Sequence, residues 1–119
     1  MKKIMITTCA LLALAISLPS SAHIFNPAKT KHPIMLVPGI FAFDTIAVVD
    51  YWYNIPGPLE SKGATVHAAK INAFDSSAMR GEELIAQMED IIAAAPWWKP
   101  VSKFNLMGHS QGGMTARYV

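Results

Sequence analysis

The sequence predicts an α/β protein built on a parallel sheet, and three observations support this fold class. Short apolar segments of strand length alternate along the chain with helical segments. Each expected strand is almost continuously apolar, which is typical of parallel strands that are covered on both faces. The length of 119 residues fits a single small domain, and a hydrophobic content of 52% is sufficient for a core.

The N-terminus is predicted to be a secretory signal peptide, residues 1–22, and the domain is predicted to comprise residues 23–119. Lys2 and Lys3 precede the apolar stretch Ile4–Leu18, and small residues then lead to a cleavage position after Ala22. The apolar stretch is shorter than the ~20 residues that a bilayer-spanning helix needs. We therefore expect an exported protein, periplasmic or extracellular.

Removal of this segment changes the charge and the cysteine content. Lys2 and Lys3 leave, so that ten basic residues become eight against eight acidic ones. The mature chain is then formally neutral and gives no indication of nucleic-acid binding. Cys9, the only cysteine, leaves as well, so that the mature part is expected to have no disulfide and to depend on packing.

The first half of the mature chain contains two expected strands around a short helix. Ile34–Val37 is an apolar run that Pro38-Gly39 ends. After a loop, a short helix is expected to begin at Pro58 and to end at Gly63. Thr65–Ala69 follows as a second, weaker strand.

The second half contains the clearest helix and the third strand. A helix is expected over about Ser77–Ala95, because its apolar residues share one face of a 3.6-residue period. Asp75 and Arg80 bracket its start and are expected to form a local cap or ion pair. Phe104–Met107 is the third strand, and Met114–Val119 is expected to begin another helix.

A serine between two glycines, in Gly108-His109-Ser110-Gln111-Gly112, follows the third strand directly. In a nucleophile elbow the serine occupies a strained strand-to-helix turn, where side chains at −2 and +2 would collide. Such a turn aims the backbone N–H of Gln111 at the oxyanion that forms during attack. The alternative interpretation is a glycine-rich structural turn, but the Val37–Phe41 segment occupies the place of the loop that supplies a second oxyanion donor in α/β-hydrolases.

Other candidate residues have simpler interpretations. His109 adjoins the serine, so that its side chain is expected to point away from the hydroxyl rather than to act as the base. His67 is interpreted as a packing or surface residue. Trp97 and Trp98 are interpreted as a hydrophobic corner under a loop, with lipid contact as the alternative.

The stretch from His32 to Val119 resembles the N-terminal third of the secreted bacterial triacylglycerol lipases of the Pseudomonas–Burkholderia type, family I. The matching blocks occur in order along the chain and are Pro33–Val37, Gly39–Asp44, Asp50–Pro56, Gly63–Val66, Arg80–Leu84, Asn105–Ser110, Gly112-Gly113 and Arg117–Val119. The resemblance implies an α/β-hydrolase fold that is truncated after the nucleophile elbow, a parallel sheet with flanking helices.

The resemblance also implies roles for individual residues. Ser110 would attack the ester carbonyl and form an acyl-enzyme, and Gly108 and Gly112 would shape its turn. The backbone N–H groups of Ile40 and Gln111 would form the oxyanion hole. One departure from the family is Pro38, where these lipases carry histidine.

The catalytic partners of the serine are not apparent in the sequence. In α/β-hydrolases the acid and the histidine follow the serine, and no His, Asp or Glu lies beyond Ser110. We therefore expect an incomplete lipase that is inactive by itself; alternatives are a non-catalytic remnant, or another α/β-hydrolase such as an esterase or acyltransferase. A serine protease with upstream His67 and Asp75 or Asp90 fits the strand-to-helix setting poorly.

The resemblance further implies which molecules the protein meets. An acylglycerol or other ester at a lipid interface is the expected substrate. No cofactor is expected in this chain, whereas the complete family members carry a calcium site. A dedicated, membrane-anchored folding chaperone is the implied protein partner.

Overall fold

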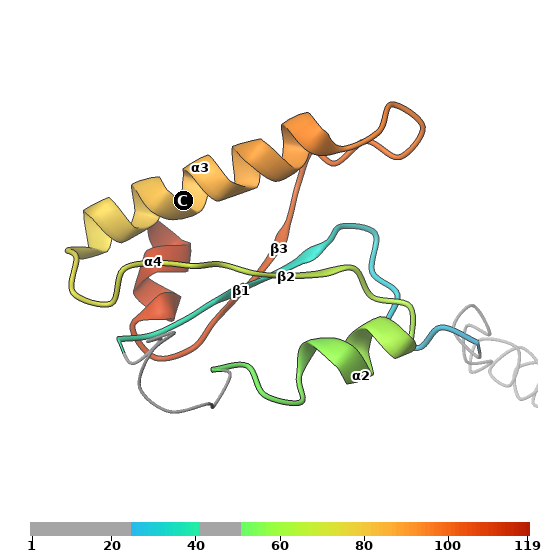
Figure 1. Ribbon diagram of the computed structural model, residues 1–119, viewed down its shortest axis with the longest axis horizontal. Helices are drawn as coiled ribbons and strands as arrows, with labels where there is room; N and C mark the ends of the chain where they lie inside the picture. Colours follow the sequence, from blue (N-terminus) through green and yellow to red (C-terminus); the bar gives the residue numbers. More distant parts are fainter. Residues whose placement is uncertain (1–24, 41–50) are drawn as a thin grey trace, which may run out of the picture.

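The computed structural model describes residues 25–40 and 51–119 (Figure 1). The expected signal peptide, and the part of the resemblance that falls on residues 41–50, lie outside the described residues. The elements in chain order are β1 (Ile34–Val37), α2 (Pro56–Ser61), β2 (Val66–Ala68), α3 (Ser77–Ala94), β3 (Asn105–Gly108) and α4 (Gly112–Tyr118).

The three strands form one parallel sheet in the order β2-β1-β3. Ile34 of β1 pairs with Val66 of β2 on one side and with Asn105 of β3 on the other. The expectation of three parallel strands, with the strand before Ser110 beside β1, is therefore confirmed. Strand β1 is the central strand of this sheet, so that it is hydrogen-bonded along both edges.

Helices cover both faces of the sheet, α3 and α4 on one and α2 on the other (Figure 1). Side chains alternate along β1, so that Met35 and Val37 pack with Leu84 of α3, whereas Ile34 and Leu36 pack on the α2 side. All four β1 side chains are buried. The continuous apolar run in the sequence thus results from burial of both faces of the strand.

The observed element boundaries correct several expected ones. Helix α2 begins at Pro56 rather than Pro58, because proline is tolerated in a first turn, where no intrahelical acceptor needs its N–H. Strand β3 lies one residue later than expected, and α4 begins at Gly112, two residues before Met114. The long helix α3 matches its expected span to within one residue.

The start of α3 also corrects the expected role of Asp75 and Arg80. Ser76 is the N-cap residue, since its Oγ accepts a hydrogen bond from the backbone N–H of Met79 at 3.3 Å. Arg80 is fully buried and contacts uncharged oxygen atoms rather than the Asp75 carboxylate. The expectation of a local cap or ion pair between these residues was therefore wrong.

Two side chains of α3 hold the connection that leads into this helix. Gln87 accepts from the backbone N–H of Lys70 at 2.9 Å and donates to the same residue's carbonyl at 2.8 Å. Glu83, one turn earlier, accepts from the N–H of Asn72 at 2.9 Å. In residues 25–40 and 51–119, no helix has the length and apolar character that crossing a membrane requires.

Candidate functional site

Ser110 lies in the turn that joins β3 to α4, at the carboxyl end of the sheet. Its backbone has φ of +56°, a left-handed conformation that is uncommon for a residue with a side chain. The turn is held to the central strand, because the N–H of His109 donates to the carbonyl of Val37 at 3.0 Å. The serine is exposed, although the conformation of its backbone is strained and tightly held.

The two glycines around Ser110 lie where no side chain fits. A Cβ at Gly112 would come within 2.0 Å of the Val37 carbonyl oxygen. A Cβ at Gly108 would come within 2.5 Å of the backbone nitrogen of Gly113. Both neighbours are backbone atoms that cannot move without moving the sheet or the helix. The Gly-x-Ser-x-Gly spacing is thus required by the close approach of β1, β3 and α4.

The segment that follows β1 packs directly against this turn. A Cβ built at Gly39 would lie 3.0 Å from the Cβ of Ser110 and 3.2 Å from the carbonyl oxygen of His109. Pro38, the departure from the family pattern, is fully buried, and its carbonyl accepts from Arg80 Nη2 at 2.6 Å. The proline therefore packs into the protein, and Gly39, which directly precedes Ile40, borders the serine turn.

Two backbone donors at this junction have no acceptor within the part of the chain that the structure describes. The N–H of Ile40 and the N–H of Gln111 take part in none of the hydrogen bonds there. By contrast, the following N–H groups, of Gly112 and Gly113, donate to the carbonyls of His109 and Ser110 at 2.9 and 3.0 Å. Unpaired donors beside an exposed serine hydroxyl can bind a developing oxyanion.

Arg80 lies beneath the junction and was not identified by sequence reasoning as a part of the site. Its guanidinium donates to the carbonyls of Pro38 and Asn72, each at 2.6 Å, and to Thr115 Oγ1 at 3.3 Å. A second, longer contact joins Nη2 to the Gly39 carbonyl at 3.5 Å. This one side chain connects the loop after β1, the loop before α3 and helix α4. Its only sequence signal was its place in one of the blocks of the resemblance.

Tyr51 lies on the solvent side of the same junction and was likewise not identified. Its hydroxyl accepts from the N–H of Gly39 at 2.9 Å and is 2.5 Å from Nδ1 of His109. The His109 side chain is therefore hydrogen-bonded to Tyr51. No local sequence pattern relates Tyr51 to His109, because 58 positions separate them.

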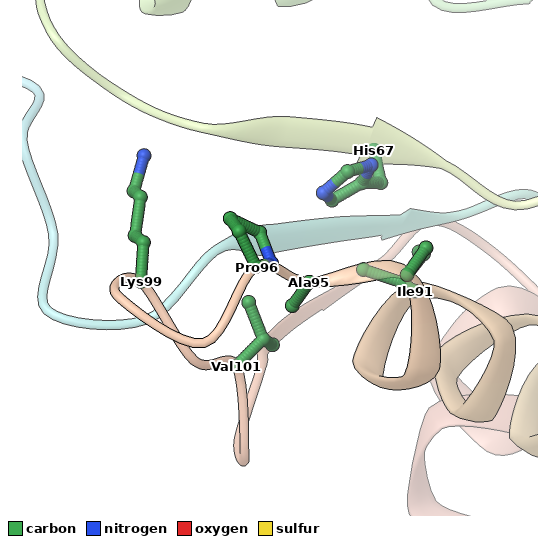
Figure 2. Close-up of a pocket in the computed structure, with 7 residues that line it drawn as sticks. His67, Ile91, Ala95, Pro96, Lys99 and Val101 are labelled. Atoms are coloured by element: carbon green, nitrogen blue, oxygen red, sulfur yellow. The ribbon is translucent and has the colours of Figure 1, made fainter.

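The remaining candidates lie away from Ser110. His67 lines a shallow, largely apolar pocket of about 290 Å³ together with Ala95, Pro96 and Lys99, at the far end of α3 (Figure 2). Its ring also contacts Phe104 edge-on, which agrees with a packing role. Trp97 and Trp98 are 87% and 71% exposed, so the expected hydrophobic corner under a loop was wrong for these side chains. Within residues 25–40 and 51–119, no cluster of His, Cys, Asp and Glu suited to a metal ion is present.

A parallel α/β sheet followed by a strained serine turn is typical of α/β-hydrolases, and comparison with known proteins supports this class. No protein-family model matches the chain. The chain is 41% identical to a triacylglycerol lipase of Vibrio cholerae, over 99% of this chain and 38% of that protein. It is 42% identical to one of Burkholderia plantarii, over 85% of this chain and 28% of that protein. A third, from Pseudarthrobacter phenanthrenivorans, is 45% identical over 77% of this chain and 29% of its own length.

These similarities confirm the resemblance to bacterial triacylglycerol lipases. The chain spans about a third of the length of the curated relatives it matches, between 28% and 38% for these three.

Proposed function

We propose that this chain is the nucleophile-bearing part of a secreted triacylglycerol lipase with an α/β-hydrolase fold. Ser110 is the nucleophile in this proposal, and the backbone N–H groups of Ile40 and Gln111 form the oxyanion hole. The observation that carries it is the junction of the two segments: a strained, exposed serine beside two backbone donors that have no acceptor within the described residues. Similarity to lipases over nearly the whole chain favours the same chemistry.

The reaction begins with attack of Ser110 Oγ on the ester carbonyl carbon, while its proton passes to a histidine base. The carbonyl oxygen becomes an oxyanion that Ile40 and Gln111 bind through their N–H groups. The C–O bond to the alcohol breaks, the histidine protonates the alcohol, and an acyl-enzyme remains. Water then attacks the acyl-enzyme with the same base, releases the fatty acid and restores the serine.

The histidine and its acidic partner complete the proposed site. In α/β-hydrolases both follow the serine in chain order, and this sequence, which spans about a third of its relatives, has no His, Asp or Glu after Ser110. We propose that these two groups, and a calcium site, belong to the complete protein. Secretion through the signal peptide 1–22, an acylglycerol substrate at a lipid interface and a dedicated folding chaperone are parts of the same proposal.

The experiment uses the protein expressed from its complete reading frame, with and without the expected chaperone. Hydrolysis of emulsified long-chain triacylglycerol is compared with hydrolysis of a short soluble p-nitrophenyl ester. Ser110→Ala should lower both rates by about 10⁴-fold or more, since this change removes the nucleophile. Ser102→Ala, an exposed serine before β3, is the matched control and should retain the wild-type rate.

The outcomes separate the alternatives that the sequence left open. Activity on the soluble ester alone would indicate an esterase, and acyl transfer to an added alcohol in preference to water would indicate an acyltransferase. Absence of any Ser110-dependent reaction, together with no covalent labelling of Ser110 by an alkyl fluorophosphonate, would identify a non-catalytic protein and contradict the proposal.

A further inference from the structure

We propose that Tyr51 is a positioning residue that locks the loop carrying Ile40 onto the turn carrying Ser110. Its hydroxyl relays a hydrogen bond from the N–H of Gly39 to Nδ1 of His109. Gly39 directly precedes Ile40, and His109 directly precedes Ser110, so that the relay joins the two halves of the candidate site. This inference rests on the proposed function for its kinetic consequences, but not for its geometry.

The direction of the relay is fixed at the Gly39 end and is assigned at the His109 end. The Gly39 N–H can only donate, so the Tyr51 oxygen is its acceptor. The hydroxyl retains one hydrogen, and the Nδ1 atom of His109 is its neighbour at 2.5 Å. A phenol oxygen can also accept a second hydrogen bond, and we assign the hydroxyl hydrogen to the bond with Nδ1, which then accepts. A chain of donors that runs in one direction is mutually polarised, which strengthens each bond.

Aromatic neighbours fix the position of the Tyr51 ring. The ring of Trp52 lies edge-on to it, with centroids 5.0 Å apart, and the ring of His109 lies edge-on at 5.8 Å. Trp52 and His109 also contact each other, with centroids 6.4 Å apart. The three rings form a cluster in which the hydroxyl of Tyr51 is held toward the loop rather than free to rotate into solvent.

A single peptide group is clamped between Tyr51 and Arg80. The group that joins Pro38 to Gly39 donates its N–H to Tyr51, while its carbonyl accepts from the buried Arg80. Because N–H and C=O point in opposite directions across a trans peptide, these two partners fix the orientation of its plane. The two bonds therefore fix the position of the Gly39 Cα atom, from which the next peptide, the one with the Ile40 N–H, continues.

The next peptide shows the consequence for the oxyanion hole. The Gly39 carbonyl lies 3.5 Å from Arg80 Nη2, on the buried side. The N–H of Ile40 belongs to the same trans peptide, so it points away from Arg80. Donors in such a hole must lie about 2.7–3.1 Å from the oxyanion, so that a displaced loop lowers the rate without removing any catalytic group.

The test uses the full-length protein and a soluble ester. Tyr51→Phe removes one oxygen atom and should lower kcat by about tenfold with KM within about twofold of wild type, because only transition-state binding is weakened. Tyr53→Phe is the matched control: this neighbouring tyrosine is 76% exposed and should retain wild-type values. Unchanged thermal unfolding of both variants would exclude a general loss of structure.

Two changes at His109 separate positioning from direct contact with substrate. His109→Asn places a side-chain oxygen near the Nδ1 position and should keep kcat within about threefold of wild type, because the acceptor is preserved. His109→Leu removes the acceptor and should resemble Tyr51→Phe. The double variant Tyr51→Phe with His109→Leu should be no slower than either single variant, since the two side chains act as one unit. The proposal would be overturned if the losses in kcat of the two single variants added up in the double variant, or if kcat of Tyr51→Phe stayed within about twofold of wild type.

A second measurement does not depend on catalysis. Hydrogen exchange of the Gly39 amide should accelerate about tenfold or more in Tyr51→Phe, whereas the β1 amides should exchange as in wild type, because only the Gly39 bond is lost. Unchanged Gly39 exchange would contradict the relay even if the enzyme is active. If wild-type protein shows no Ser110-dependent activity, the proposed function fails, and the exchange result still decides the relay.

Discussion

Substitution of Arg80 by lysine tests how the catalytic loop is supported from inside the protein. The guanidinium is fully buried and donates to two backbone carbonyls, of Pro38 and Asn72, at 2.6 Å each. It also donates to Thr115 Oγ1 at 3.3 Å. Lysine keeps the positive charge but replaces the planar fork with one ammonium group, which cannot reach three acceptors in different directions.

The expected loss follows from the number of bonds that lysine cannot replace. If the ammonium retains one of the two short bonds, one charge-assisted bond is lost, worth about 1.5–3 kcal/mol, and a buried carbonyl is left unpaired. We therefore expect the free energy of unfolding to fall by about 2–4 kcal/mol. A displaced Ile40 N–H should also lower kcat, by about tenfold for each 1.4 kcal/mol of lost transition-state binding.

The assay is urea unfolding of the full-length protein, together with kcat on a soluble ester at a temperature where both variants are folded. Arg117→Lys, an exposed arginine on α4, is the matched control and should change the free energy of unfolding by less than about 0.5 kcal/mol. If Arg80→Lys were as stable and as active as Arg117→Lys, the Arg80 guanidinium would not support the loop after β1, and the prediction would be refuted.

Three further predictions concern the serine turn, the pH dependence and export. Gly112→Ala should sharply lower the yield of folded protein in a solubility and thermal unfolding assay, because the alanine Cβ would lie 2.0 Å from the Val37 carbonyl oxygen. Gly113→Ala is the matched control and should be tolerated, since its Cβ would have no neighbour within 4 Å. The hydrogen bond from Tyr118 to Glu82, together with that carboxylate's charge, raises the pKa of the Tyr118 phenol above 10, and Glu82→Gln should lower it in an ultraviolet titration. The stabilisation from this bond should be complete below pH ~10 and be lost as the pH rises through the raised pKa. Mass spectrometry of exported protein should find His23 at the N-terminus, and retention of residues 1–22 would contradict the signal-peptide prediction.

The sequence by itself determined the elements of the fold and the location of the serine. Ile34–Val37 is recognisable as a buried strand because all of its side chains are apolar, and α3 because its apolar residues recur with a helical period. The Gly-x-Ser-x-Gly pattern is recognisable over five residues, although only the Gly108 clash arises within the turn, whereas the Gly112 clash is with Val37 of β1. Apolar runs, helical periodicity and a short motif extend over few residues, so that they can be recognised without knowledge of the fold.

Only the tertiary structure decided what holds the serine turn and the loop after β1 together. Arg80 reaches the Pro38 carbonyl across 42 positions, and Tyr51 reaches His109 across 58. Helical position predicted a local cap or ion pair for Arg80, and nothing in the sequence distinguished Tyr51 from its exposed neighbour Tyr53. The physical reason is that a hydrogen bond between distant residues depends on which elements pack against each other. The order β2-β1-β3 brings the loop after the first strand beside the turn after the last one, and no local pattern encodes that juxtaposition.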